Sequence, residues 1–181
     1  MLPNPLHPAI VHFPIVLAFL LPLFIGGAWW SIRRGAVVRR AWLVPTAVAV
    51  ALVASAWLSV QTGDAQSERV EQFVGAAPLD AHEDLAEAFL TASAAMALLT
   101  VAGLLGGRPG RTARTLTGFG SLALAGLVVR VGHTGGELVY RHGAASAYTA
   151  PASNDTNRTA SIIAAPARDD QRRPAATPDK Q

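Results

Sequence analysis

Four long stretches without a charged side chain dominate this sequence and leave few folds open to it. The stretches cover residues 1–32, 41–63, 88–107 and 115–129. A helix needs about 20 apolar residues to cross a bilayer, so the first three are long enough. The fourth reaches that length if Arg130 extends its guanidinium to the interface. We therefore predict an all-α integral membrane protein, a bundle of four transmembrane helices over about residues 8–31, 41–61, 84–106 and 115–132.

The overall composition agrees with a membrane protein. Hydrophobic residues make up 51% of the chain and charged residues only 15%, which is too apolar for a soluble domain of this length. The isoelectric point of about 10.2 would also suit a nucleic-acid-binding protein. The basic residues, however, lie in short clusters between apolar stretches, so membrane topology explains them better and we expect no nucleic-acid partner.

Arginines divide the connections between the predicted spans into two kinds. The connections at residues 33–40 and 108–114 carry only basic charges, whereas the segment at 64–84 carries six acids and a single arginine. Positively charged connections stay in the cytoplasm. We therefore predict that the acidic segment and both termini lie outside.

Composition changes again after Gly143. The remainder is rich in Ala, Pro, Thr, Asn and Asp and has little hydrophobic periodicity, which is typical of disordered segments. We predict a membrane domain over residues 1–143 and a flexible, periplasmic C-terminal tail over residues 144–181.

Cysteine is absent. Its absence excludes disulfides, thiolate-held iron–sulfur clusters, C-x-x-C-H haem attachment and a cysteine nucleophile. Histidine and carboxylate are then the strong metal ligands that remain.

All five histidines fall on the predicted outer side. They are His7, His12, His82, His133 and His142. A helix bundle can bring imidazoles from separate segments to one centre, and nitrogen ligands without thiolate suit a bis-histidine haem b, copper or zinc. Arg130 and Arg141 lie on the correct side to pair with haem propionates.

Within the first span, His12 is the stronger candidate. It lies about one turn inside the apolar stretch, where ionisable groups usually face a partner in the interior. His7 precedes it by five residues, about 140° around an ideal helix, so both cannot face inward from one regular helix. This leaves His7 as a possible N-terminal cap.

The segment "GHTGGELVYRHG" at the end of the fourth span also stands out. Gly135 and Gly136 permit a turn with positive φ, so we expect the helix to break there. The following piece would fold back and return His142 toward His12 and His82.

The opening "HPAIVHFPI", the histidine heading the third span and the closing "GGELVYRHG" together resemble a bacterial family of predicted four-helix membrane proteins of unknown function. The resemblance covers residues 6–143. Members of that family are sometimes joined to, or encoded beside, cytochrome c or Rieske-type domains, which implies a respiratory setting in the bacterial inner membrane. The positions that match its motifs are His7, His12, His82 and His142, and His133 ranks below them.

These features favour a membrane-embedded, b-type haem-binding electron-transfer subunit with its histidines at the periplasmic face. Expected partners are the bilayer, other membrane subunits, and a quinol, a periplasmic cytochrome c or a Rieske-type protein. A copper- or zinc-binding membrane protein is an alternative, as is a cofactor-free accessory subunit of a respiratory or photosynthetic complex. No nucleophile–base pair is evident, so we do not expect an independent enzyme.

Overall fold

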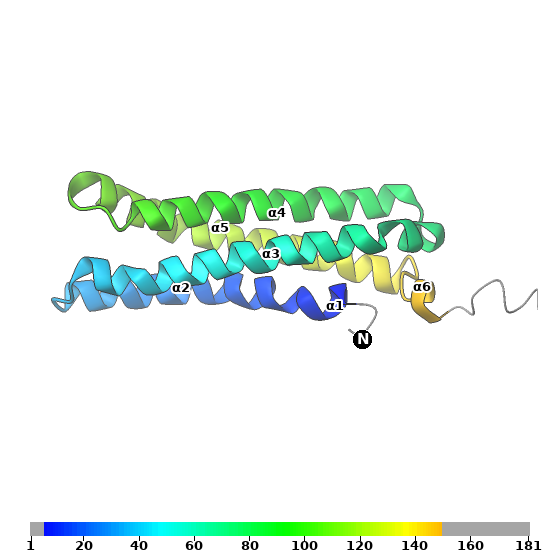
Figure 1. The fold of residues 1–181 in the computed structure, drawn as a ribbon, viewed down its shortest axis with the longest axis horizontal. Helices are drawn as coiled ribbons and strands as arrows, with labels where there is room; N and C mark the ends of the chain where they lie inside the picture. Colours follow the sequence, from blue (N-terminus) through cyan, green and yellow to red (C-terminus); the bar gives the residue numbers. More distant parts are fainter. Residues whose placement is uncertain (1–5, 150–181) are drawn as a thin grey trace, which may run out of the picture. The chain divides into compact units, whose positions relative to one another are not determined.

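The structure is a computed structural model that describes residues 6–149. Its helices are α1 (His7–Ile10), α2 (His12–Arg33), α3 (Val38–Val74), α4 (Ala76–Ala102), α5 (Gly107–Tyr140) and α6 (Ser146–Thr149). The described range contains no strand. Helices α2 to α5 run side by side, each packed on the next in the chain and α2 also on α5 (Figure 1). The prediction of a four-helix all-α bundle is confirmed.

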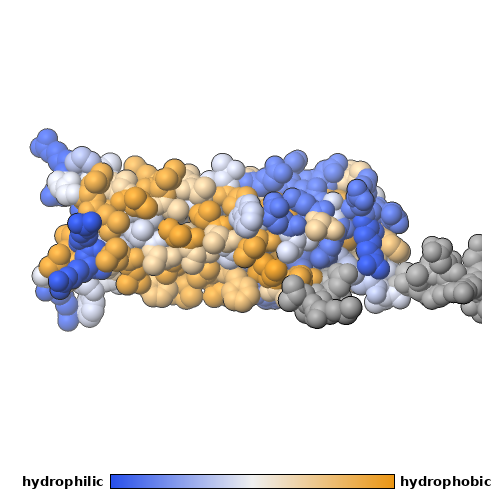
Figure 2. Space-filling view, viewed as in Figure 1, coloured by the Kyte–Doolittle hydropathy of each residue, from blue (hydrophilic) through white to orange (hydrophobic). Residues whose placement is uncertain are grey.

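Four helical segments are long and apolar enough to cross a membrane, α1 and α2 together forming the first. Figure 2 shows an apolar band along much of the bundle, followed by a hydrophilic end. Large side chains on this band point outward, among them Leu98 and Phe119, each 71% exposed. An apolar exterior of this extent suits contact with lipid, which indicates a multi-pass membrane protein.

Small side chains fill much of the interior. Ser93, Thr100, Thr117 and Ser121 are fully buried, and each hydroxyl donates to a carbonyl three or four residues earlier in its own helix. Satisfying the hydroxyl locally removes the cost of burying it. Small residues at these positions let the helices approach closely, as is common in membrane bundles.

The bundle has two chemically different ends. We call the end that carries the α2–α3 and α4–α5 connections the arginine end, and the opposite end, with α1, the α3–α4 turn and α6, the histidine end. At the arginine end, Trp42 is fully buried and its Nε1 donates to the carbonyl of Thr100 over 2.9 Å. A Cβ at residue 103 would lie only 2.3 Å from that Nε1, so Gly103 makes room for the indole.

At the histidine end, the acidic segment is helical. We expected a connection between spans ending at residue 61 and beginning at 84, but α3 continues to Val74 and only Gly75, with φ 79°, separates it from α4. The 37 residues of α3 make it about 56 Å long, well beyond the ~30 Å hydrocarbon core. The projecting part is held by a second apolar cluster formed by Val74, Leu79, Leu138 and Ala144.

The prediction that the fourth helix breaks at Gly135 and Gly136 was wrong. Helix α5 runs without interruption from Gly107 to Tyr140. A glycine inside a helix costs only about 1 kcal/mol relative to alanine, and packing against the neighbouring helices outweighs that cost. His142 therefore lies beyond the end of a straight α5, and its segment does not fold back at the glycines.

Packing also continues past Gly143, where we expected the tail to begin. Ala144 and Ala147 are buried, and the Tyr148 hydroxyl donates to the side chain of Gln66 on α3. The guanidinium of Arg69 lies 5.4 Å from the centre of the Tyr148 ring. The compact unit thus ends near Tyr148, and the rest of the predicted tail, residues 150–181, lies outside the described residues.

Candidate functional site

His7 begins α1 and is held against the middle of α3. Its imidazole is half-buried, and Nδ1 lies 2.9 Å from the carbonyl oxygen of Ser59 and 3.4 Å from the hydroxyl of Thr62. A Cβ at residue 63 would lie 3.2 Å from His7 Cε1. Gly63 therefore lets the ring sit directly on the backbone of α3.

His82 lies in the first half of α4 and is held in the same manner against α5. Its imidazole is half-buried, and Nδ1 lies 2.9 Å from the hydroxyl of Thr134. A Cβ at residue 135 would lie 3.1 Å from His82 Cε1. Gly135 thus serves this ring as Gly63 serves His7.

The hydrogen-bond partners determine which ring nitrogen carries the proton. The Ser59 carbonyl can only accept, so His7 must donate through Nδ1–H. The Thr134 hydroxyl donates to the carbonyl of Val131 over 3.0 Å, so its oxygen is left to accept from His82. In their neutral forms both imidazoles then keep the lone pair on Nε2, the atom available to a metal.

These two sets of contacts reveal a correspondence between the two halves of the bundle. In each half, a histidine on the first helix meets a Thr-Gly pair on the second, 55 residues later for His7 and 52 residues later for His82. The Thr-Gly dipeptide occurs three times, at residues 62–63, 117–118 and 134–135, and Gly118 of the middle one packs against Trp29 instead of a histidine. The contacts of Ser59, Thr62, Gly63 and Thr134 were not predicted from the sequence, because the dipeptide alone does not distinguish the two copies that hold a histidine from the third.

The two imidazoles lie within electrostatic range of each other. Asp64, next to Gly63, is similarly close to His7. Figure 1 shows that α1 lies at the same end of the bundle as the turn between α3 and α4. His7 and His82 are thus two half-buried imidazoles at the histidine end, each held by a neighbouring helix.

The other predicted ligands lie elsewhere. His12 is exposed on α2, and His142 is exposed beyond α5. Arg130 is also exposed. Of the predicted histidines, the structure half-buries His7 and His82 and leaves His12, His133 and His142 exposed.

His133 and Arg141 take part in a small surface network on α5. The Glu137 carboxylate lies 3.7 Å from His133 Nε2 and 2.6 Å from an Arg141 nitrogen. These side chains line a shallow hollow of about 310 Å³. Because all of them come from one helix and its end, the hollow does not connect with His7 or His82.

Across residues 6–149, no three or more histidine, aspartate or glutamate side chains are grouped so that they could hold a metal ion. The donor set of the site is therefore two imidazole nitrogens. That number suits a cofactor that brings its own additional ligands better than a bare ion that needs three or four from the protein.

A scan of protein-family models found no match to this chain, and searches of curated proteins and of solved structures found none either. The resemblance to the four-helix bacterial family stays a prediction carried by the two terminal motifs.

Proposed function

We propose that this chain is a membrane subunit that binds a b-type haem between His7 and His82 and transfers electrons at the histidine end of the bundle. The observation that carries the proposal is that both imidazoles donate through Nδ1 to the protein and keep Nε2 available. Histidines that ligate a metal are usually held through the other ring nitrogen in this way.

The number and type of donors favour haem over other metal groups. A structural zinc site takes four protein ligands and a catalytic one three, more than the two imidazoles supply. Cu(I) prefers sulfur ligands, and the chain has no cysteine and only two methionines. Haem b would need no more than two nitrogens from the protein, which His7 and His82 would provide, and it would supply a one-electron carrier.

The two imidazole nitrogens fit haem as donors. A haem macrocycle would also need space between the helices. Two hollows on the bundle, of about 450 and 310 Å³, are lined by other side chains. His7 packs on α3 and His82 packs on α5, so the two imidazoles belong to different helical hairpins. We expect these two hairpins to move apart around His7 and His82 when haem binds.

The charge distribution supports an orientation for this activity. The arginine end would face the cytoplasm by the positive-inside rule, placing the two-histidine site and both termini at the periplasmic face of a bacterial inner membrane. Electrons would then be exchanged with a quinol, a periplasmic cytochrome c or a Rieske-type protein.

A copper or zinc ion is the second candidate occupant. The packing around the histidines favours it, because an ion needs less space than a macrocycle. The Asp64 carboxylate lies near His7, and Glu83 is close enough to interact with Asp64. A cofactor-free accessory subunit is the third candidate.

The test is a dithionite-reduced minus air-oxidised absorption spectrum of the natively expressed, detergent-purified chain, with metal analysis of the same sample. We expect a sharp α-band and equal amounts of iron and haem. The band should be lost in His7→Ala and His82→Ala and retained in His12→Ala, which removes an exposed imidazole.

Other results identify the alternatives. A featureless spectrum from a wild-type sample that contains copper or zinc would identify the metal ion as the occupant, provided that the metal is lost in the same two variants. A purified chain that contains no metal would support the third candidate, the cofactor-free accessory subunit.

A further inference from the structure

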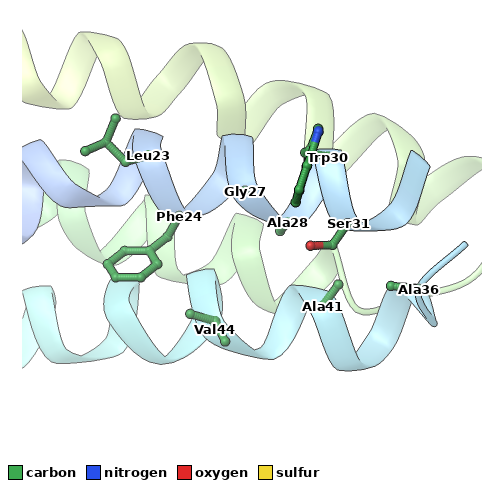
Figure 3. A pocket seen from close by; sticks show the side chains of 9 residues that line it. All are labelled: Leu23, Phe24, Gly27, Ala28, Trp30, Ser31, Ala36, Ala41 and Val44. Atoms are coloured by element: carbon green, nitrogen blue, oxygen red, sulfur yellow. The ribbon is translucent and has the colours of Figure 1, made fainter. Parts of the chain in front are cut away.

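A groove runs between α2 and α3 at the arginine end (Figure 3). It has a volume of about 450 Å³, and most of its walls are apolar, with Leu23 and Phe24 from α2 and Val44 from α3. Leu23 and Val44 are 69% and 50% exposed. The groove therefore opens on the exterior of two helices that are apolar enough to span the membrane, where lipid would meet it.

The connection that closes this groove is strongly basic. Ser31, Ala36 and Ala41 line it, and the exposed side chains of Arg33, Arg34, Arg39 and Arg40 lie between them in the chain. Within residues 6–149, the ion pairs all involve Glu137 at the other end, so no acid neutralises these four arginines.

One of the arginines is directly connected to the groove. The Arg34 guanidinium lies 4.0 Å from the centre of the Trp30 ring, and Trp30 lines the groove. Stacking on an aromatic face leaves the guanidinium edge available to a phosphate. An apolar groove and a cationic group therefore meet at the arginine end of the bundle.

We propose that this groove binds an anionic phospholipid, with an acyl chain along α2 and α3 and the phosphate at Arg33, Arg34, Arg39 and Arg40. The apolar walls match the acyl chain, and four unneutralised guanidinium groups match the negative headgroup. This site is independent of the histidines and of any cofactor bound to them.

The first experiment is native mass spectrometry of the full chain in detergent, with dioleoyl phosphatidylglycerol or dioleoyl phosphatidylcholine added separately. The two lipids have the same acyl chains, so a difference in affinity reports on the headgroup. We expect phosphatidylglycerol to bind severalfold more tightly. Equal affinity for the two lipids would overturn the proposal.

Two neighbouring glycines on α2 allow a test of the groove by a pair of matched substitutions. Gly26 and Gly27 both have open space where a side chain would extend, but only Gly27 lines the groove. Gly27→Leu should fill it and weaken phosphatidylglycerol binding severalfold, whereas Gly26→Leu should leave binding unchanged. The proposal fails if both variants bind as wild type does, or if they weaken binding equally.

The arginines are tested by removing two charges at the groove and, as a control, two charges elsewhere at the arginine end. An arginine near a membrane surface contributes about 1 kcal/mol to anionic-lipid binding, or about fivefold in affinity. Arg33→Gln with Arg34→Gln should therefore weaken phosphatidylglycerol binding by more than tenfold. Arg108→Gln with Arg111→Gln, in the first turns of α5 at the same end, should have little effect. An equal loss in both double variants would reduce the site to general surface charge. A second protein chain retained in place of lipid would also overturn the proposal, because the occupant would then be a protein.

Discussion

The Nδ1 atom of His82 on α4 lies 2.9 Å from the hydroxyl oxygen of Thr134 on α5, and the next residue, Gly135, packs against the same ring. Orientation of this imidazole is thus controlled by the neighbouring helix rather than by its own. His7 is held by α3 in the same manner. Each half of the bundle therefore aims one imidazole with a carbonyl or hydroxyl acceptor and a glycine, which is how a binding site can be pre-organised before its ligand arrives.

Two adjacent glycines in α5 should differ in their effect on His82. A Cβ at Gly135 would lie 3.1 Å from His82 Cε1, while one at Gly136 would meet nothing within 4 Å. Gly135→Val should displace the imidazole and abolish most haem or metal binding. Gly136→Val has the same change in helix propensity and should retain binding. The comparison is made by absorption spectroscopy and metal analysis of both purified variants, and equal retention would contradict the assigned role of His82.

The hydroxyl of Thr134 should determine the tautomer of His82. Thr134→Val keeps the shape of the side chain and removes the acceptor, which should cost about 1 kcal/mol of stability and release the proton from its fixed position. Thr134→Ser keeps the hydroxyl acceptor, so it should retain both the stability and the fixed position of the proton on Nδ1. Nitrogen NMR of histidine-labelled protein distinguishes the protonated ring nitrogen directly. An unchanged spectrum in Thr134→Val would show that another group controls the tautomer.

Trp42 should contribute more to stability than an exposed tryptophan. Trp42→Phe removes the hydrogen bond to the Thr100 carbonyl and leaves a void in the core, at a cost of about 1–3 kcal/mol. Trp57 is 53% exposed, so Trp57→Phe should change stability by no more than about 0.5 kcal/mol. Thermal unfolding in detergent, followed by circular dichroism, measures both. Equal melting temperatures would mean that Trp42 is not part of the folded core.

Ionisation of Tyr148 should loosen the segment that follows α5. Burial raises the pKa of the Tyr148 phenol above its ordinary value near 10, although the charge of Arg69 partly opposes the rise. The folded state thus holds the phenolic proton more tightly than the unfolded state. The stabilisation is fully present below about pH 10 and is lost as pH rises through the raised pKa.

This titration can be observed without interference. The chain has two tyrosines, so Tyr148 is the only one left in Tyr140→Phe, and phenolate absorbance then reports on it alone. We expect the folded chain to titrate at higher pH than the same chain in denaturant. Coincident curves would show that Tyr148 is solvated in the folded protein.

Several features of the fold could be predicted from the amino-acid order alone. An uncharged stretch such as residues 41–63 has few alternatives to a helix in a bilayer, because every backbone amide and carbonyl must be satisfied within the segment. The turn from α3 to α4 at Gly75 was harder to predict. The polar residues between 64 and 84 are compatible with either loop or helix, and the cluster of Val74, Leu79, Leu138 and Ala144 favours the helix through contacts far apart in sequence.

For the histidines too, one feature could be predicted from the sequence and another depended on contacts between helices. The angle between His7 and His12 on a helix correctly indicated that only one could face inward, and depth in the apolar stretch favoured His12. The structure instead half-buries His7 and leaves His12 exposed. Local depth says nothing about which side of α1 and α2 meets α3, whereas Ser59 and Gly63 provide the acceptor and the space on that side.

The number of spans, their helical state and the absence of thiol chemistry thus follow from the composition of each segment. The half-burial of His7 and His82, held by the Thr-Gly pairs at residues 62–63 and 134–135, depends instead on the folded bundle. An imidazole acquires its orientation and tautomer from groups on another helix, and helix pairing depends on packing across the whole bundle.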